Sequence, residues 1–250
     1  MNFNNKVVIV TGASSGIGAA IAVAFSSEGA NVVMVGRNEA RLAAVAKKCK
    51  NPLVIIGDVA EDAVIRKIID QTIEKFGQID VLVNNVGTAI GLGSFTDGDI
   101  IKSFDNIMRV NVRAAVFLIT LATPHLMKTK GNVVNISSVV VQMGTGYPGL
   151  TNYNISKAAL NHLTVCAASE LGPYSIRVNT VSPGPVVTNF LEHSNIPARC
   201  EDFTQRTALN QISQPEEIAD LVIFLAGPKA KSITGSCYVI DNGFLVKQSF

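Results

Sequence analysis

The chain of 250 residues is poor in the side chains that build metal centres and disulfide frameworks. It has four cysteines, three histidines and no tryptophan. It contains no Cys-x-x-Cys pair and no histidine spacing suited to zinc, so we predict neither a metal site nor a disulfide framework. We interpret the cysteines as small apolar residues and the histidines as structural or surface residues. They are Cys49, Cys166, Cys200, Cys237, His125, His162 and His193.

Charged side chains are also scarce, at 16% of the chain, and 21 basic against 19 acidic residues give a net charge of +2. No basic run exceeds Lys47-Lys48, so nucleic acid is not expected as a partner. The longest charge-free apolar stretch near the middle, 114–123, is too short to span a bilayer. The first residues lead into a strand pattern rather than a signal peptide. We therefore expect a cytoplasmic protein without a membrane span.

Hydrophobic residues make up 48% of the chain, which is enough for one well-buried domain covering 1–250. Apolar runs alternate with segments of helical periodicity. The expected strands are 6–10, 31–35, 53–56, 80–83, 132–137, 176–181 and 237–240. The expected helices are 17–27, one from 38, 61–76, roughly 99–126, 152–171 and 215–225. This alternation predicts a single-domain Rossmann-like fold, a doubly wound α/β architecture with seven parallel strands and helices on both faces.

In such a fold, ligands bind at the carboxyl ends of the strands, beside the point where the strand order reverses. The segment 184–213 is rich in Pro, Thr, Asn and Ser and is the one long segment without a clear secondary-structure pattern. We predict that it covers the substrate.

A glycine run follows the first expected strand and opens the first helix, in the order Thr11-Gly12-Ala13-Ser14-Ser15-Gly16-Ile17-Gly18. Backbone N–H groups and the positive helix end at this position can hold a dinucleotide pyrophosphate. Gly12 can form the turn, Gly16 can admit the pyrophosphate, and Gly18 can allow close helix packing. The spacing differs from the usual G-x-G-x-x-G, and a plain tight turn is the alternative. We assign Ser14, Ser15 and Ile17 to the same cofactor site.

The ends of the second and third strands carry the residues expected near the adenosine half of a cofactor. Arg37 lies nineteen positions after Gly18, and a guanidinium suits a 2′-phosphate, which favours NADP(H) over NAD(H), with NAD(H) still possible. The alternative is a solvated arginine at a helix start, with Asn38 as the cap. At the third strand, Asp58-Val59 leaves two interpretations open: Asp58 accepts the adenine amino group, or it caps the next helix.

The fourth strand ends in Asn84-Asn85-Val86-Gly87, a turn able to pass its backbone beside the cofactor. We assign Asn84 and Gly87 to the cofactor site. Gly87 is the member that sterics make hardest to replace.

Ser138, Tyr153 and Lys157 form the expected catalytic group. Residues four apart share a helix face, so the Lys157 ammonium can stabilise the Tyr153 phenolate and lower a pKa that is normally about 10. Ser138 ends the fifth strand, at the predicted crevice. Ser137 is the competing serine, but strand alternation directs it to the opposite face.

These motifs together resemble the short-chain dehydrogenase/reductase family, in particular its group of about 250 residues, which includes 3-oxoacyl-carrier-protein reductases and hydroxysteroid dehydrogenases. The resemblance covers essentially the whole chain. Its elements are Thr11-Gly12-x-x-x-Gly16-x-Gly18, Asp58, Asn84-Asn85-x-Gly87, Asn111, Ser138, Tyr153-x-x-x-Lys157, Pro183-Gly184 and Thr188. Val86 stands where the family usually has alanine.

The resemblance implies a mechanism in which Tyr153 exchanges a proton with the substrate oxygen while hydride moves to or from nicotinamide. Ser138 would polarise the carbonyl, and Lys157 would lower the Tyr153 pKa and bind the nicotinamide ribose. Asn111 would position a water that connects Lys157 to solvent. Residues after the sixth strand would approach the nicotinamide and the phosphates. They are Pro183, Gly184, Val186 and Thr188, with Val186 and Val187 flanking the ring.

The expected pocket wall is mainly apolar and favours a hydrophobic ketone or secondary alcohol, such as a steroid-like, isoprenoid or 3-oxoacyl compound. The wall comprises 89–95, Val141, Met143, Tyr147, Pro148, Leu150, Phe190, Leu191 and Phe203. One alternative is an NAD-dependent secondary-alcohol dehydrogenase. Another is a non-catalytic nucleotide-binding regulator, although the intact catalytic group argues against it. The resemblance also implies a homotetramer or homodimer built through the helices after strands four and five and the C-terminal strands.

Overall fold

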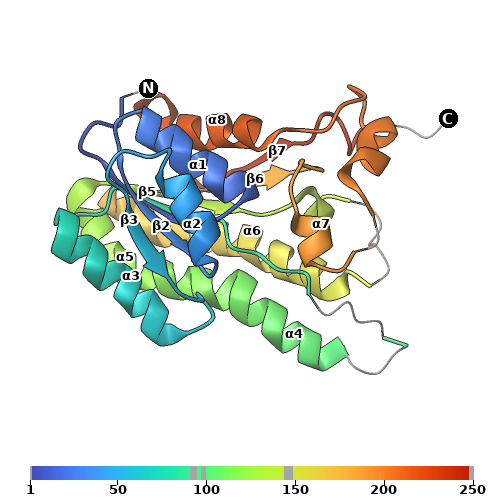
Figure 1. Ribbon diagram of the computed structural model, residues 1–250, viewed down its shortest axis with the longest axis horizontal. Helices are drawn as coiled ribbons and strands as arrows, with labels where there is room; N and C mark the ends of the chain where they lie inside the picture. The colour runs from blue at the N-terminus through green and yellow to red at the C-terminus, as the bar shows by residue number, and fades with distance from the viewer. Residues whose placement is uncertain (1, 91–94, 97–99, 144–148, 197, 248–250) are drawn as a thin grey trace.

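A computed structural model describes residues 2–90, 95–96, 100–143, 149–196 and 198–247 (Figure 1). Its seven parallel strands form one sheet in the order β3-β2-β1-β4-β5-β6-β7. They are β1 (Val7–Thr11), β2 (Asn31–Gly36), β3 (Leu53–Ile56), β4 (Val81–Asn84), β5 (Asn132–Ile136), β6 (Arg177–Pro183) and β7 (Cys237–Ile240). The predicted doubly wound α/β fold is confirmed.

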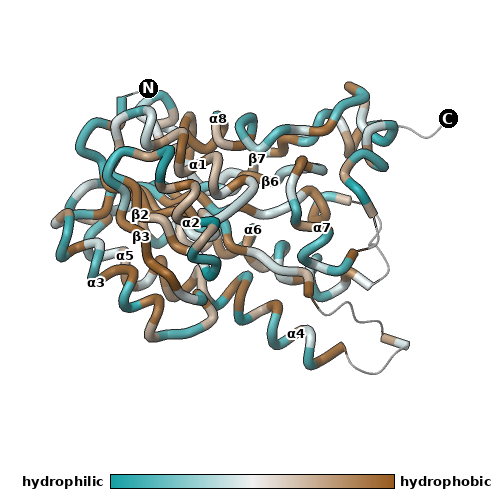
Figure 2. The backbone as a smooth tube through the Cα atoms, viewed as in Figure 1, coloured by the Kyte–Doolittle hydropathy of each residue, from teal (hydrophilic) through white to brown (hydrophobic). Residues whose placement is uncertain are grey.

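Helices cover both faces of this sheet. They are α1 (Gly16–Ser27), α2 (Glu39–Ala46), α3 (Asp62–Phe76), α4 (Ile100–Met108), α5 (Ala114–Thr129), α6 (Thr151–Leu171), α7 (Phe190–His193) and α8 (Pro215–Ala226). Helices α1 and α8 lie on one side of the sheet, and α3, α5 and α6 lie on the other (Figure 1). Strands covered on both faces are rich in apolar residues, as the brown strands β2 and β3 in Figure 2 show, whereas β6 carries several polar residues.

Alternate residues of one strand enter two separate cores. In β1, Val8 and Val10 pack with Ile21 and Phe25 of α1, whereas Val7 and Ile9 belong to the core under α3 and α5. This follows from the two-residue period of a strand, which directs neighbouring side chains to opposite faces. The β-branched composition of β1 suits such a doubly buried position.

The strand order reverses at β1, which lies between β2 and β4. The connections after β1 and β4 leave in opposite directions, and a crevice opens at the carboxyl ends of the strands at such a point. Helix α2 begins after β2 under a cap, since Oδ1 of Asn38 accepts a hydrogen bond from the backbone N–H of Arg41 at 2.9 Å. The proposed capping role of Asn38 is therefore confirmed.

The helix predicted at 99–126 is interrupted by one turn of π-helix. Helices α4 and α5 are joined by the π-helical turn η1 (Arg109–Arg113), which holds the buried Asn111. By length and hydropathy alone, the continuous helix Ile100–Thr129 is able to cross a membrane, although core helices satisfy the same criterion. Here α5 packs against α3, and η1 packs against α6.

Candidate active site

The glycine loop between β1 and α1 has backbone geometry that favours small residues. Gly12 and Gly16 have φ values of 70° and 51°. A Cβ at Gly18 would lie 2.3 Å from the carbonyl oxygen of Gly12, so the expected close packing at Gly18 is observed. The first turn of α1 has no acidic residue, and its N-cap, Ser15, makes no side-chain capping hydrogen bond within the described chain. The helix thus presents backbone N–H groups and its positive end at the loop.

Further predicted cofactor residues border this loop. A Cβ at Gly16 would meet Cγ2 of Thr188 at 2.9 Å, and a Cβ at Gly36 would meet Oγ of Ser14 at 3.4 Å. Ile17 packs against the core beneath α1. The loop therefore lies between the end of β2 and the segment that follows β6.

The loop is fastened to β4 by two residues that sequence analysis did not assign to the site. Oγ1 of Thr11 donates a hydrogen bond to the carbonyl of Val83 at 3.2 Å and accepts one from the backbone N–H of Asn85 at 3.0 Å. Nδ2 of Asn85 donates to the carbonyl of Thr11 at 2.9 Å. Asn85 thereby fixes the position of the glycine loop, and its place beside Asn84 in the motif was the available signal.

Arg37 and Asp58 meet at the ends of β2 and β3. Nη1 of Arg37 lies 3.4 Å from Oδ2 of Asp58, and the Arg37 side chain is 72% exposed. Oδ1 of Asp58 accepts a hydrogen bond from the backbone N–H of Ala60 at 2.9 Å, whereas the N-cap of α3 is Glu61. The helix-cap interpretation of Asp58 is therefore wrong, because its carboxylate closes a turn before the helix. Val59 is buried in the core.

Ser138, Tyr153 and Lys157 lie together and are all buried. The Ser138 side chain lies near the Tyr153 phenol and acts to lower the pKa of Tyr153. Nζ of Lys157 lies 5.6 Å from the centre of the Tyr153 ring and donates a hydrogen bond to the carbonyl of Ile136 at 2.9 Å. Ser137 is occupied elsewhere, since its Oγ donates to the carbonyl of Lys157 at 3.2 Å.

The pKa values of this group differ from the sequence-based expectation. Burial raises the pKa of Tyr153 to about 12, against a smaller lowering by the Ser138 side chain. Burial also lowers the pKa of Lys157 to about 8. Desolvation dominates the pKa of Tyr153 in this structure, where the Lys157 ammonium hydrogen-bonds to the Ile136 carbonyl, so the expected net lowering of the Tyr153 pKa is not seen.

Asn111 connects the segment after β4 to α6. Its Oδ1 accepts a hydrogen bond from the backbone N–H of Thr88 at 2.8 Å. Its Nδ2 donates to the carbonyl of Thr88 and to Oγ of Ser156, each at 2.9 Å. Ser156 in turn donates to the carbonyl of Tyr153 at 2.7 Å. Both amide hydrogens of Asn111 are thus donated to protein acceptors, so its side chain positions the backbone around Tyr153. Sequence analysis predicted neither this effect nor the part of Ser156 in it.

Gly87 allows Lys157 to reach its position. A Cβ at residue 87 would lie 3.1 Å from Nζ of Lys157 and 3.9 Å from Oδ1 of Asn111. A larger residue would displace the ammonium group. This contact gives a physical reason for glycine here.

Asn84 hydrogen-bonds to the neighbouring strand. Its Nδ2 donates to Oδ1 of Asn135 at 2.9 Å, while its own Oδ1 is buried and has no hydrogen-bond partner among the described residues. Asn84 lines a cavity of about 10 Å³ together with Val59 and Asn111. That volume is close to the minimum that holds one water molecule, and a water there would satisfy the orphaned oxygen.

Comparison with known proteins identifies the family. The profile of a family described as enoyl-(acyl carrier protein) reductase matches residues 12–245. A short chain dehydrogenase from Burkholderia cenocepacia, solved in complex with NADP, superposes with a TM-score of 0.87 at 32% identity, covering 98% of this chain and 99% of that one. The chain belongs to the short-chain dehydrogenase/reductase family.

Other members of the family are similar over nearly their whole length. A meso-2,3-butanediol dehydrogenase from Serratia marcescens is 38% identical, covering 97% of this chain and 96% of that protein. A 3-ketoacyl-(acyl-carrier-protein) reductase from Brucella melitensis, solved with NADH, has a TM-score of 0.90 at 28% identity and covers 98% of this chain and 100% of that one. This short-chain dehydrogenase/reductase is accordingly an oxidoreductase that acts on CH–OH groups with a nicotinamide cofactor.

The segment after β6 of this short-chain dehydrogenase/reductase packs tightly before it crosses the crevice. A Cβ at Gly184 would lie 2.7 Å from Cβ of Asp241, so the glycine is explained by contact with the chain after β7. Val186 is buried and pairs with Ser213 in an isolated parallel bridge. Pro183 is the last residue of β6. The segment therefore reaches the glycine loop, at Thr188, from a fixed base.

The predicted apolar wall is only partly assembled around Tyr153. The Phe190 ring lies 5.6 Å from the Tyr153 ring. Phe203 packs against Phe244, and Phe95 is 79% exposed, so these observations place neither ring against Tyr153. Both rings belong to loops whose tertiary neighbours local sequence does not specify. The predictions for 91–94, Tyr147 and Pro148 concern positions outside the described residues.

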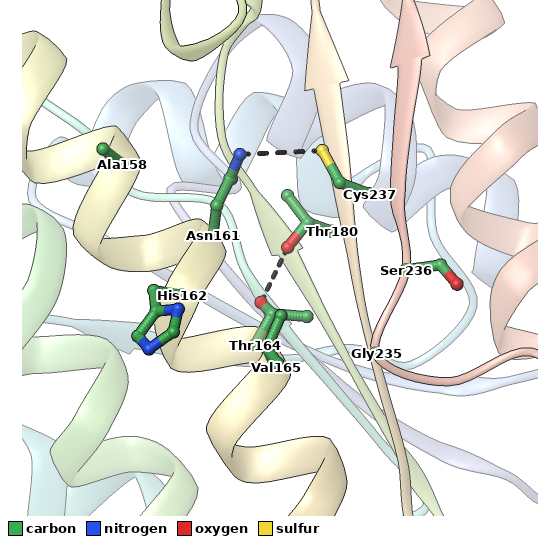
Figure 3. A pocket seen from close by; sticks show the side chains of 9 residues that line it. All are labelled: Ala158, Asn161, His162, Thr164, Val165, Thr180, Gly235, Ser236 and Cys237. Carbon is green, nitrogen blue, oxygen red and sulfur yellow. Dashed lines mark hydrogen bonds between the residues drawn. The ribbon is translucent and has the colours of Figure 1, made fainter.

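A cavity of about 270 Å³ is lined by none of Ser138, Tyr153 and Lys157 (Figure 3). It lies between α6 and the chain that enters β7, with Asn161 and Cys237 facing each other across it (Figure 3). The glycine loop and the buried Ser138, Tyr153 and Lys157 lie instead at the carboxyl ends of the strands, which makes this edge of the sheet the candidate site. Figure 3 also shows the contact between Thr164 and Thr180, whose hydroxyl oxygens are 2.6 Å apart.

Proposed function

We propose that this chain interconverts a hydrophobic ketone and its secondary alcohol with NADP(H) as hydride donor or acceptor. The observation that carries the proposal is the buried group of Ser138, Tyr153 and Lys157, in which Nζ of Lys157 lies 5.6 Å from the centre of the tyrosine ring. A structural role alone does not require a buried phenol, hydroxyl and ammonium to meet at the ligand-binding edge of the sheet.

The glycine loop suits a dinucleotide. The close approach of Gly16 to Thr188 leaves no room for a side chain, and the start of α1 offers N–H groups to a pyrophosphate. Arg37 is exposed at the end of β2, where it would bind a 2′-phosphate, and Asp58 lies next to it. Thr188 would hold the phosphate side of the cofactor. When bound, the nicotinamide would supply or accept the hydride.

The proton chemistry belongs to Tyr153. With a pKa of about 12, the phenol keeps its proton at neutral pH, as required of a general acid that protonates the oxygen of a ketone. In this reduction, hydride adds to the carbonyl carbon, the C=O π electrons move to oxygen, and the Tyr153 proton forms the new O–H bond. Ser138 holds the oxygen by a hydrogen bond. Lys157, largely protonated below a pKa of about 8, stabilises the phenolate that remains.

An apolar substrate fits the side chain nearest to the acid. Phe190 lies against Tyr153, and Val141 and Leu150 flank the catalytic group in sequence. Steroid-like, isoprenoid and 3-oxoacyl compounds satisfy this requirement. We further propose that the 184–213 segment covers the bound substrate, because it carries Phe190 from β6 to the tyrosine.

An NAD-dependent secondary-alcohol dehydrogenase is the second candidate. Arg37 faces the Asp58 carboxylate at 3.4 Å, which reduces the positive potential available to a 2′-phosphate. The related Brucella reductase, which was solved with NADH, supports the same alternative.

A homotetramer or homodimer remains our proposal for assembly. Val116 of α5 and Ile155 and Val165 of α6 expose apolar side chains on the helices that follow β4 and β5. A second copy of the chain would bury them. We place the enzyme in the cytoplasm, as expected from its sequence.

The cofactor assignment is tested by titrating the protein with NADPH and with NADH while nicotinamide fluorescence is recorded. Arg37→Asp should weaken NADPH binding by about tenfold or more and leave NADH binding within about twofold, because one charge-assisted contact is lost. Lys67→Asp on α3 makes the same change of charge away from the crevice. Equal NADPH affinity in wild type and Arg37→Asp would show that Arg37 does not bind the phosphate.

The acid-base assignment is tested with Tyr153→Phe. This variant should bind cofactor as wild type does but reduce an apolar ketone about 100- to 10,000-fold more slowly, because only the proton donor is removed. Tyr174→Phe, at a tyrosine that is 49% exposed, is the matched control. Turnover at the wild-type rate in Tyr153→Phe would refute the assignment.

A further inference from the structure

A hydrogen bond joins the segment after β2 to the segment after β6. Nη1 of Arg41, in the first turns of α2, lies 3.1 Å from Nε2 of His193, the last residue of α7. The two residues are 152 positions apart. Arginine has only donors, so Nε2 of His193 is the acceptor. Both side chains are exposed, and no role in the proposed chemistry accounts for the contact.

Both partners are attached to well-defined structure. The backbone N–H of Arg41 donates to the Asn38 cap at 2.9 Å, which fixes the start of α2 beside Arg37. The backbone N–H of His193 donates to the carbonyl of Asn189 at 2.9 Å. At the opposite end of α7, Phe190 lies against Tyr153. Helix α7 thus reaches from the catalytic tyrosine to the adenosine side of the crevice.

The glycine loop lies between these attachments. Thr188, two residues before α7, lies against Gly16, and Gly36 at the end of β2 lies against Ser14. The Arg41–His193 contact therefore joins the segment after β2 to the segment after β6, and both segments contact the glycine loop. A ligand seated on the glycine loop would lie beside the two segments that this contact holds together.

We infer that Arg41 and His193 form a latch that holds α7 across the crevice and limits the rate at which nicotinamide cofactor dissociates. The inference rests on the proposed function only in placing a nicotinamide cofactor at the glycine loop. The latch acts on α7 and not on a phosphate. It therefore slows the release of NADPH and of NADH by the same factor.

Stopped-flow displacement of bound NADPH, and separately of NADH, by excess oxidised cofactor tests this inference in the full-length chain. Arg41→Ala and His193→Ala should each speed release of both cofactors by about two- to fivefold, as expected for an exposed polar contact. The double variant should release no faster than either single variant, because both changes remove the same contact. His193→Gln keeps an acceptor and should restore slow release. Lys48→Ala, at the far end of the helical segment, is the control for a lost surface charge.

Three outcomes would overturn the latch. Release rates that match wild type in both single variants would show that the contact does not restrain α7. If Arg41→Ala sped the release of NADPH but not of NADH, and did so also in a chain carrying His193→Ala, Arg41 would be a phosphate ligand and not part of a latch. If the wild-type chain bound neither cofactor, the latch and the proposed function would both be refuted. If Arg41→Ala and His193→Ala released cofactor faster but the wild type reduced no ketone, the latch would be supported and the proposed function refuted.

Discussion

Replacing Lys157 with methionine should change how the stability of the folded chain depends on pH. Burial lowers the pKa of Lys157 from 10.5 to about 8. At 1.36 kcal/mol for each pH unit, that difference corresponds to a penalty of about 3 kcal/mol for keeping the ammonium charged in the folded protein. Methionine has a similar length and carries no charge, so Lys157→Met removes this penalty.

The sign follows from proton binding. A lysine with a depressed pKa binds fewer protons in the folded state than in the unfolded state between about pH 8 and pH 10.5. The free energy of unfolding therefore rises with pH across that window in the wild type. Between about pH 7 and about pH 9.5, Lys157 should contribute about 2 kcal/mol to this rise, and the contribution is absent in Lys157→Met.

Urea unfolding followed by circular dichroism is the suitable assay, because the chain has no tryptophan. Measurements should stop below pH 10, because Tyr153 then begins to contribute. Its pKa is raised to about 12, so its contribution lowers the free energy of unfolding as the pH rises from 10 through about 12. The absolute stability of Lys157→Met also includes the loss of the hydrogen bond to the Ile136 carbonyl, so the pH dependence is the decisive quantity. Lys67→Met on α3 is the surface control.

Wild-type and Lys157→Met curves that run parallel from about pH 7 to about pH 9.5 would refute the conclusion that burial depresses this pKa. The variant should also lose most turnover, because Lys157 stabilises the Tyr153 phenolate in the proposed mechanism. A more stable but inactive variant would show that the site keeps a buried charge at the expense of stability.

Two further changes test packing in and below the site. Gly18→Ala should lower the unfolding free energy by about 1–3 kcal/mol and abolish cofactor binding, because its Cβ would lie 2.3 Å from the Gly12 carbonyl oxygen. The control is Gly172→Ala, where a Cβ would meet open space and the change should be nearly neutral. An equally neutral Gly18→Ala would contradict the close packing at Gly18. Thr164→Val should lower the free energy of unfolding in urea by about 2–3 kcal/mol, because Asn135 and Thr180 lose a buried hydrogen-bond partner. The control is Thr120→Val, on the exposed face of α5. Equal effects of the two substitutions would refute the stabilising role of the hydrogen bonds among Asn135, Thr164 and Thr180.

Local sequence was sufficient for the parts of the site that depend on short-range geometry. The spacing of Tyr153 and Lys157 on one helix, the glycine run after an apolar strand, and the separation of Ser137 from Ser138 all follow from the periods of helices and strands. The positions of the strands could be predicted for the same reason, because doubly covered strands are rich in apolar residues.

Contacts between distant segments could not be predicted in this way. Asn111 hydrogen-bonds to Thr88 and Ser156 and lies on a π-helical turn. No local sequence pattern predicts either feature. The direction of the Tyr153 pKa shift was also missed, because it depends on burial rather than on the i,i+4 spacing.

The sequence by itself determined the doubly wound sheet, the glycine loop and the shared helix face of Tyr153 and Lys157, since each depends on periodicity or on residue type over a few turns of chain. Only the tertiary structure decided that Arg37 faces Asp58, that Phe203 packs on Phe244, and that Arg41 meets His193. Such contacts arise from how loops after different strands converge at one sheet edge, which depends on the packing of the whole chain.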